Sequence, residues 1–202
     1  SRSTKSHARR LDLERYRRRT TQPSTGRIMR IAVIGAGISG LTAARTLQDQ
    51  GHRVTVFEKS RGPGGRAATR RIDELEFDHG AQYFTARDPA FQRAVAAWRE
   101  RGLVTAWNGL IGRVRDGRIE PEDHKQERLV SVPGMSAIGK HLAADLTVHT
   151  GVRVAPPQRL NGRWSLRSDT RETLGDFDLL IVAVPAPQTE ALLGPVAPDL
   201  AA

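Results

Sequence analysis

A glycine-rich turn from Gly35 to Gly40 is the part of the sequence most directly tied to chemistry. It reads Gly35-Ala36-Gly37-Ile38-Ser39-Gly40, the spacing G-x-G-x-x-G, between a short apolar run and a helical pattern. In such a turn the first glycine permits a sharp bend, the second lets a pyrophosphate approach the backbone, and the third lets the helix pack closely. The helix start offers free N–H groups and a positive dipole end to phosphate charge. The turn therefore predicts a site for a dinucleotide diphosphate.

An acidic residue follows at the distance that a ribose contact requires. Glu58 lies 18 residues after Gly40, at the end of a second apolar run. Its carboxylate can accept hydrogen bonds from a ribose diol, and it would repel the 2′-phosphate of NADP. The alternatives are a glycine turn without a ligand and a merely solvated Glu58. The strand before the turn, the helix after it and the acid beyond them favour a dinucleotide.

The next motif bears on which dinucleotide is bound, because the fingerprint alone leaves NAD and FAD open. Lys59 follows Glu58, and the chain then reaches Gly64-Gly65-Arg66. A second glycine pair brings another stretch of backbone close to a cofactor, and Arg66 can pair with a phosphate or hold the loop. The alternative for Arg66 is an ordinary surface arginine. Its place directly after two glycines favours a role at the cofactor over that alternative, and the motif as a whole favours FAD.

The elements that position these residues can be read from hydrophobic periodicity. Arg30–Ile34 and Arg53–Phe57 are predicted strands, with a helix between them that carries Leu41, Ala44 and Leu47 and ends at Gly51. They form one βαβ unit. Asp88 and Pro89 are predicted to begin a helix that ends at Gly102. Further predictions are a helix over 135–146, a strand through Val148, Val152 and Val154, a meander over 164–167 and 174–177, a strand of the cofactor sheet over 179–184, and a helix over 188–193.

Composition limits the class of protein. The chain has 202 residues and no cysteine, which excludes disulfides and thiolate metal sites. No apolar run is long enough for a membrane span. Residues 1–28 hold nine Lys or Arg against two acidic residues and so carry most of the net charge of +10. We expect a cytoplasmic protein with a disordered basic leader at 1–28; a functional basic arm and an organelle transit peptide are the alternatives.

Several motifs together resemble a known family. They are Gly35 to Gly40 with Glu58, Gly64-Gly65-Arg66, Asp78-His79-Gly80-Ala81-Gln82-Tyr83, Val130-Ser131-Val132-Pro133-Gly134-Met135 and Ala183-Val184-Pro185. From about Arg30 to Leu193 the chain resembles the FAD-dependent amine oxidase superfamily and, within it, the renalase-like flavoproteins. The match is most specific in its first third.

The resemblance implies an α/β fold: a Rossmann-like FAD/NAD(P)-binding domain with an interleaved α+β substrate domain. We expect an FAD-binding βαβ unit and glycine-rich loop at 29–85, a substrate-domain segment at 86–135, and a return to the FAD domain with a small β-meander at 136–194. The family's closing segment has no counterpart in the sequence. We therefore expect a C-terminally truncated chain with a tail at 195–202.

The resemblance also implies roles for single residues. Val154 is expected to approach the adenine through its backbone, and Gly80, Ala81 and Gln82 to lie beside the isoalloxazine ring. Gln82 is the candidate catalytic residue, whereas His79 and Tyr83 are better explained by packing. The predicted cofactor-binding set is Gly35, Ala36, Gly37, Ile38, Ser39, Gly40, Glu58, Lys59, Gly64, Gly65, Arg66, Gly80, Ala81, Gln82 and Val154. No metal site is expected.

The implied function is an FAD-dependent oxidoreductase. It would move a hydride from an amine or a dihydronicotinamide-like molecule to flavin N5, with oxygen as the final acceptor. The expected partners are a small-molecule substrate and oxygen, with neither nucleic acid nor membrane. The alternatives are an NAD-dependent oxidoreductase and a non-catalytic dinucleotide-binding fragment. Nucleic-acid binding through the basic leader lacks a stacking motif or a helix-turn-helix pattern.

Overall fold

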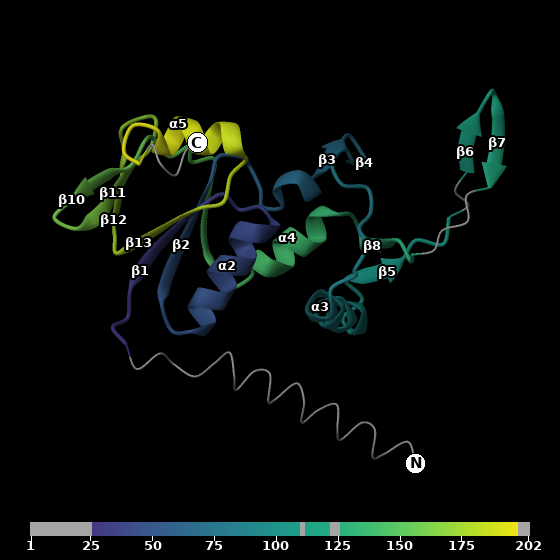
Figure 1. Ribbon diagram of the computed structural model, residues 1–202, viewed down its shortest axis with the longest axis horizontal. Coiled ribbons are helices and arrows are strands. Elements are labelled where there is room, and N and C mark those ends of the chain that lie inside the picture. Colours follow the sequence, from purple (N-terminus) through teal and green to yellow (C-terminus); the bar gives the residue numbers. More distant parts are fainter. Residues whose placement is uncertain (1–25, 110–111, 122–125, 198–202) are drawn as a thin grey trace, which may run out of the picture. The chain divides into compact units, whose positions relative to one another are not determined.

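The computed structural model describes residues 26–109, 112–121 and 126–197, and Figure 1 labels most of its helices and strands. The chain divides into two compact units: residues 1–63 with 142–202, and residues 64–141. Most of the predicted leader at 1–28, and the last five residues of the predicted tail, lie outside the described residues. The predicted boundaries of a substrate domain remain a prediction.

A four-stranded parallel sheet forms the centre of the first unit. Its strands are β1 (Arg30–Ile34), β2 (Arg53–Glu58), β9 (Thr147–Thr150) and β13 (Leu179–Val182), in the order β13-β1-β2-β9. Helix α2 (Ile38–Asp49) connects β1 to β2, which confirms the predicted βαβ unit. β13 pairs with β1 in parallel, so the predicted strand over 179–184 does join the cofactor sheet.

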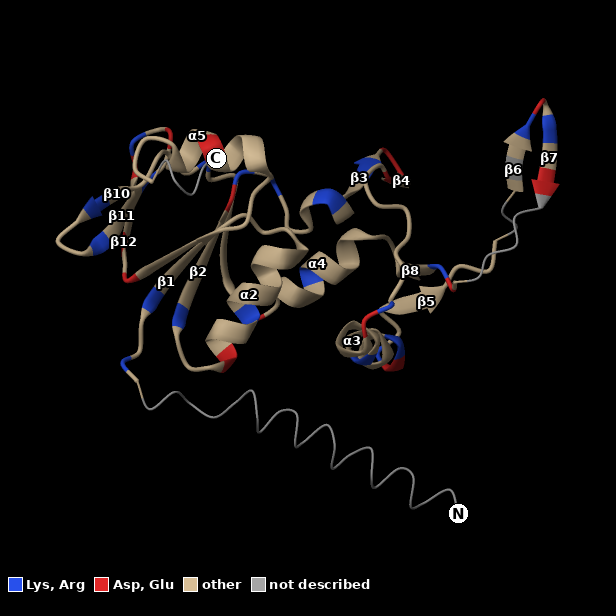
Figure 2. Cartoon of the chain, in the orientation of Figure 1, with Lys and Arg blue, Asp and Glu red and all other residues tan. Residues whose placement is uncertain are grey.

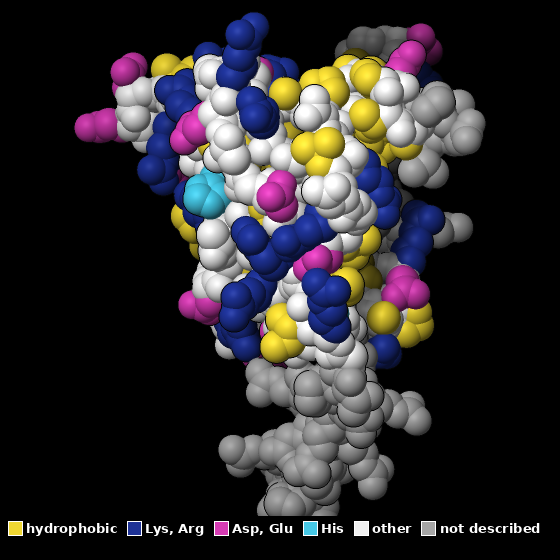
Figure 3. Space-filling view, turned by 90° about the vertical axis from the view of Figure 1, so that its left-hand side faces the viewer, with side chains coloured by type: hydrophobic (Ala, Val, Ile, Leu, Met, Phe, Trp, Pro, Cys, Tyr) yellow, Lys and Arg dark blue, Asp and Glu magenta, His cyan; other side chains and the backbone are white. Residues whose placement is uncertain are grey.

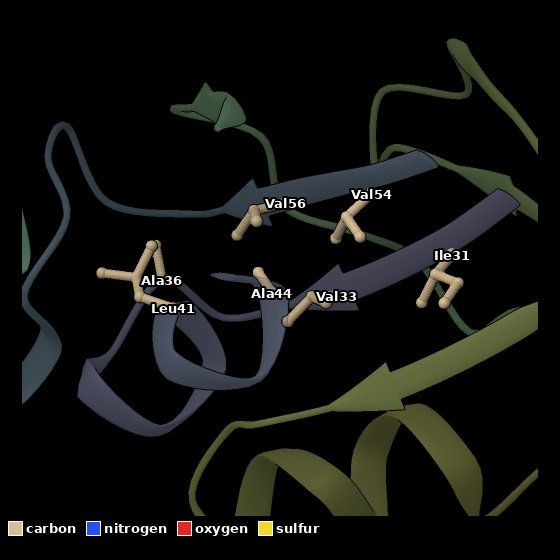
Figure 4. Packing of buried hydrophobic residues seen from close by; sticks show 7 residues of the cluster. All are labelled: Ile31, Val33, Ala36, Leu41, Ala44, Val54 and Val56. Carbon is tan, nitrogen blue, oxygen red and sulfur yellow. The ribbon is translucent and has the colours of Figure 1, made fainter. Parts of the chain in front are cut away.

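Alternate residues of β1 enter two different cores, because successive side chains of a strand point to opposite faces. Ile31 and Val33 pack against α2, in the cluster of Figure 4. Ala32 and Ile34 pack on the opposite face with Phe57, Val154, Leu166 and Phe177. The centre of the sheet is therefore apolar on both faces, and charged residues lie at the strand ends: Arg30 and Arg53 begin β1 and β2, and Glu58 ends β2 (Figure 2).

An antiparallel meander covers the second core. Its strands are β10 (Gln158–Leu160), β11 (Arg163–Arg167) and β12 (Thr173–Phe177), with β11 in the middle. The predicted meander is confirmed and has one strand more than expected. β11 alternates inward Trp164 and Leu166 with outward Arg163 and Arg167, and basic side chains gather on this side of the molecule (Figure 3). Helix α5 (Ala186–Leu193) follows β13, as predicted.

The predicted strand through Val148, Val152 and Val154 is interrupted. β9 ends at Thr150, and Gly151 turns the chain with a φ of 71°. Val154 lies beyond this turn and pairs with Ser168 in an isolated antiparallel bridge. The three valines thus belong to two structures, and a positive φ at one glycine separates them.

The second unit consists of short elements. They are the 3-10 turn η1 (Gly65–Ala67), the hairpin of β3 (Thr69–Ile72) and β4 (Leu75–Asp78), helix α3 (Pro89–Glu100), the antiparallel pair of β5 (Val104–Ala106) and β8 (Leu129–Ser131), the hairpin of β6 (Gly112–Arg115) and β7 (Arg118–Pro121), and helix α4 (Ser136–Ala143), whose last two residues belong to the first unit.

The predicted start of α3 is confirmed in detail. Asp88 is the N-cap, and its Oδ1 accepts hydrogen bonds from the backbone N–H groups of Ala90 and Phe91 at 2.8 and 3.0 Å. Pro89 takes the first helical position, where its missing N–H costs nothing. None of the helices among the described residues is long and apolar enough to cross a membrane.

Candidate dinucleotide-binding site

The turn after β1 needs glycine at its first position for two reasons. Gly35 has a φ of 105°, a conformation that side chains rarely adopt. A Cβ atom at Gly35 would also lie 2.6 Å from the carbonyl oxygen of Ala183. The Gly35 N–H donates to the carbonyl of Phe57 at 2.8 Å, which extends the β1–β2 pairing into the turn. The predicted role of Gly35 in a tight turn is thus supported by backbone geometry.

The start of α2 presents backbone N–H groups that the helix does not use. The first helical hydrogen bond runs from Leu41 N–H to the Gly37 carbonyl at 2.9 Å. The N–H groups of Ile38, Ser39 and Gly40 precede it and therefore have no acceptor within the helix. Gly37 is the N-cap and has no side chain to cap them, and the first turn holds no acidic residue. This arrangement suits an anion.

Gly37 and Gly40 are glycines for different physical reasons. A Cβ atom at Gly40 would lie 2.0 Å from the Gly35 carbonyl oxygen, so close packing within the protein requires glycine there. A Cβ atom at Gly37 would meet no protein atom within 4 Å, and its φ of −72° is open to any residue. The protein itself therefore does not require glycine at position 37. A ligand that approaches the Gly37 backbone from outside the protein would require glycine there.

The Glu58 carboxylate lies beside this turn in a fixed orientation. The residue is only 7% exposed. Its Oε2 accepts a hydrogen bond from Ala36 N–H at 2.7 Å, and its Oε1 accepts one from Ser60 N–H at 2.8 Å. Each carboxylate oxygen can accept a further hydrogen bond. Glu58 is therefore not a side chain that contacts only solvent, and its carboxylate is held next to the glycine turn.

Val154 presents its backbone away from the meander. In the bridge to Ser168, the flanking hydrogen bonds run from Asp169 N–H to the Arg153 carbonyl and from Ala155 N–H to the Arg167 carbonyl, both at 2.9 Å. In an antiparallel pair of this kind, the N–H and C=O of the paired residue itself point to the other side. The geometry is compatible with a contact between the Val154 backbone and the adenine base of a dinucleotide.

In the second unit, two of the predicted motifs meet. Arg66 lies in η1, and its carbonyl accepts a hydrogen bond from Ala81 N–H at 2.8 Å. A Cβ atom at Gly80 would lie 2.1 Å from the same carbonyl oxygen. The side chains of Lys59, Arg66 and Gln82 are exposed. The structure thus brings Gly80 and Ala81 against the Gly64-Gly65-Arg66 motif.

Asp78 and Thr69, neither of which was predicted to be a site residue, link motifs in the second unit. Asp78 accepts hydrogen bonds from Thr69 and from the backbone of Met135, and Thr69 accepts one from Ser136. Asp78 belongs to a motif of the resemblance, but a separation of 57 residues from Met135 gave no local signal of the contact. The Tyr83 ring packs against two neighbours: its centroid lies 5.8 Å from that of Trp107 and 4.4 Å from the Arg128 guanidinium.

The residues of the first unit fit a nucleotide diphosphate and its adjoining ribose. Amides at the start of α2 that the helix itself does not use, with an open approach at Gly37, suit the phosphate charge, and the oriented Glu58 carboxylate suits a sugar diol. An acid in this place disfavours a 2′-phosphate. These are the contacts by which either NAD or FAD would be held.

Comparisons with known proteins match part of the chain to dinucleotide-binding proteins. The family model described as an NAD(P)-binding Rossmann-like domain matches residues 33–98. A 4,4'-diapophytoene desaturase (4,4'-diaponeurosporene-forming) of Staphylococcus aureus is 52% identical over 52 residues, which are 26% of this chain and 10% of the desaturase.

Solved structures show the same fold at low sequence identity. The CLA-producing fatty acid isomerase from P. acnes superposes with a TM-score of 0.61 at 15% identity, over 84% of this chain and 62% of the isomerase. A triple mutant of putrescine oxidase gives a TM-score of 0.61 at 14% identity, over 78% of this chain and 58% of the oxidase. The chain therefore spans about a tenth of the desaturase and about three fifths of these two structures. It has an α/β fold with a parallel sheet and a Rossmann-like dinucleotide-binding unit.

Proposed function

We propose that the chain belongs to an FAD-dependent oxidoreductase. The observation that carries this proposal is the pairing of an open backbone approach at Gly37 with a Glu58 carboxylate fixed by Ala36 N–H. The first provides for a diphosphate and the second for the neighbouring ribose. The likeness to a desaturase and to an oxidase supports FAD as the dinucleotide.

Each part of the predicted site has a role in this proposal. The amides of Ile38, Ser39 and Gly40 bind the diphosphate, and Glu58 binds the ribose. Val154 contacts the adenine through its backbone. Lys59, Gly64, Gly65 and Arg66 contribute loop contacts and positive charge, and the turn Gly80-Ala81-Gln82 lies against the isoalloxazine, with Gln82 as the candidate for contact with the reacting atoms.

The chemistry of the reaction comes from the cofactor, and the protein supplies orientation and electrostatics. When bound, the flavin would accept a hydride at N5 from the substrate, and oxygen would take the electrons onward. The proposed substrate is an amine or a dihydronicotinamide-like molecule. The likeness to putrescine oxidase favours the amine, and the renalase-like motifs favour the dihydronicotinamide.

An NAD-dependent oxidoreductase is the second candidate. It is favoured by the match to an NAD(P)-binding Rossmann-like model, because the contacts of the first unit are common to both dinucleotides. A non-catalytic dinucleotide-binding protein would show the same geometry.

The experiment is a spectral and calorimetric titration of the purified full chain with FAD, NAD⁺ and ADP. The proposal predicts flavin absorption bands that stay with the protein through gel filtration, and tighter binding of FAD than of NAD⁺. A colourless protein that binds NAD⁺ alone would establish the second candidate. A protein that binds FAD, yet whose flavin is reduced by neither amines nor dihydronicotinamides, would contradict the proposed substrates while leaving the cofactor assignment intact.

A further inference from the structure

We propose that Asp78 is a positioning residue for the flavin ring, and that it acts by holding the turn Gly80-Ala81-Gln82 in place. The inference rests on the proposed FAD binding. It adds a residue that would touch neither cofactor nor substrate, and it concerns the isoalloxazine end of the cofactor alone.

The Asp78 carboxylate attaches the β3–β4 hairpin to the start of α4. Its Oδ1 accepts hydrogen bonds from the Thr69 hydroxyl at 2.6 Å and from Met135 N–H at 3.0 Å. The Thr69 hydroxyl oxygen accepts in turn from Ser136 N–H at 3.0 Å. Met135 N–H and Ser136 N–H belong to the start of α4, where the helix leaves its N–H groups without internal acceptors and favours a negative charge.

The segment before α4 packs tightly against this pair. A Cβ atom at Gly134 would lie 2.9 Å from the Thr69 hydroxyl oxygen and 3.4 Å from Asp78 Oδ1. The Ser131 hydroxyl donates to the Gly134 carbonyl at 2.8 Å and so holds the same segment. The contact between hairpin and helix start therefore has little freedom to shift.

The turn that would face the flavin is held at both of its ends. Asp78 lies two residues before Gly80, and its side chain is tied to α4. At the other end, Ala81 N–H donates to the Arg66 carbonyl at 2.8 Å, and Gly80 packs against that same oxygen. Removal of the Asp78 carboxylate would break its bonds to Thr69 and Met135 and leave the hairpin tied to α4 by the Thr69–Ser136 bond alone. The backbone of Gly80 to Gln82, which follows Asp78 directly, would then be less constrained.

The test compares FAD with ADP, because ADP lacks the isoalloxazine. In the full chain, Asp78→Ala should weaken FAD binding at least about tenfold, while ADP affinity stays within about twofold. It should also change the absorption maximum of bound flavin and speed up hydrogen exchange at the amides of Gly80 to Gln82 in the ligand-free protein. Thr69→Val, which removes only the linking hydroxyl, should act in the same direction.

Two further variants separate positioning from general loss of structure. Asp78→Asn keeps an acceptor oxygen and should restore most of the FAD affinity. Asp73→Asn removes the same charge from the exposed turn of the same hairpin and should change nothing. The inference is overturned if Asp78→Ala binds FAD like the wild type with an unshifted spectrum, or if it weakens FAD and ADP equally. A wild-type chain that binds no FAD would instead overturn the proposed function itself.

Discussion

The Glu58 carboxylate accepts a hydrogen bond from the Ala36 backbone N–H at 2.7 Å, so the side chain that ends β2 extends the β1–β2 pairing into the glycine turn. The backbone bond from Gly35 N–H to Phe57 lies just before it. A residue expected to bind a ribose therefore also fixes the turn that would bind the diphosphate. The proposed diphosphate contact and the proposed ribose contact therefore both depend on the Glu58 carboxylate.

Glu58→Gln should lower both the stability and the nucleotide affinity. The carboxylate accepts from two backbone N–H groups, and a glutamine would turn its NH₂ donor toward one of them. A buried N–H left without an acceptor costs about 1–3 kcal/mol. Urea unfolding should show this loss, and titration with ADP should show weaker binding. Glu190→Gln, at an exposed position of α5, is the control. Equal stability and affinity for Glu58→Gln and the wild type would refute the double role.

Gly40→Ala should destabilise the protein whether or not a nucleotide is present. Its new methyl group would lie 2.0 Å from the Gly35 carbonyl oxygen and 3.1 Å from the Ala183 side chain. Overpacking against backbone typically costs about 1–3 kcal/mol or more. Thermal unfolding of the ligand-free chain should show a clear decrease in the midpoint. An unchanged midpoint would mean that α2 does not pack as closely on the turn as the structure has it.

Much of the first unit could be predicted from the sequence because its signals are local. The run from Arg30 to Ile34, the three glycines and Glu58 lie within 29 residues and describe one βαβ unit. The N-cap at Asp88 is equally local, since the capping carboxylate binds amides two and three residues on. In these segments the pattern that predicts the structure lies within a short stretch of the chain.

What could not be predicted depends on contacts between distant segments. The valines from 148 to 154 share an apolar character, and only the turn at Gly151 shows that they belong to different structures. The attachment of Asp78 to Met135 joins residues 57 positions apart. Glu58 was expected to serve a ligand, and nothing in its spacing indicated its bond to Ala36 N–H. Tertiary hydrogen bonds of this kind leave no periodic pattern.

The contribution of Asp178 to stability should depend on pH. Asp178 accepts a hydrogen bond from Arg30 N–H at 2.8 Å and lies near Arg163 and Arg27. The bond from Arg30 N–H, helped by the arginine charges and opposed by burial, holds the pKa of Asp178 below its ordinary value of 3.8. A folded-state pKa below the unfolded one means that the contribution is present above about pH 4 and is lost as the pH falls through the folded value.

Asp178→Asn should therefore be less stable than the wild type near neutral pH, and this difference should shrink below about pH 4. Urea unfolding across that range measures it. Asp176→Asn, on the exposed face of β12, should show no such convergence. A difference between Asp178→Asn and wild type that stays constant down to about pH 3 would contradict the assigned cause.

Leu166 and Leu160 offer a matched pair for the second core. Leu166 on β11 is completely buried, whereas Leu160 on β10 is 54% exposed. Leu166→Ala should lower the free energy of unfolding by about 2–5 kcal/mol, because it leaves a cavity where the meander packs on β1 and β2. Leu160→Ala should cost far less. Similar losses for both variants would mean that the meander does not cover the sheet in this way.

The most direct test of the central claim is the binding of FAD to Gly37→Ala, with Gly62→Ala as the control. At both positions an added methyl group would meet no protein atom within 4 Å, so both variants should unfold like the wild type. Only at Gly37 would the methyl group obstruct a diphosphate at the start of α2. By calorimetric titration, we expect Gly37→Ala to bind FAD at least about tenfold more weakly and Gly62→Ala to bind it normally. Wild-type affinity in a folded Gly37→Ala would contradict the account.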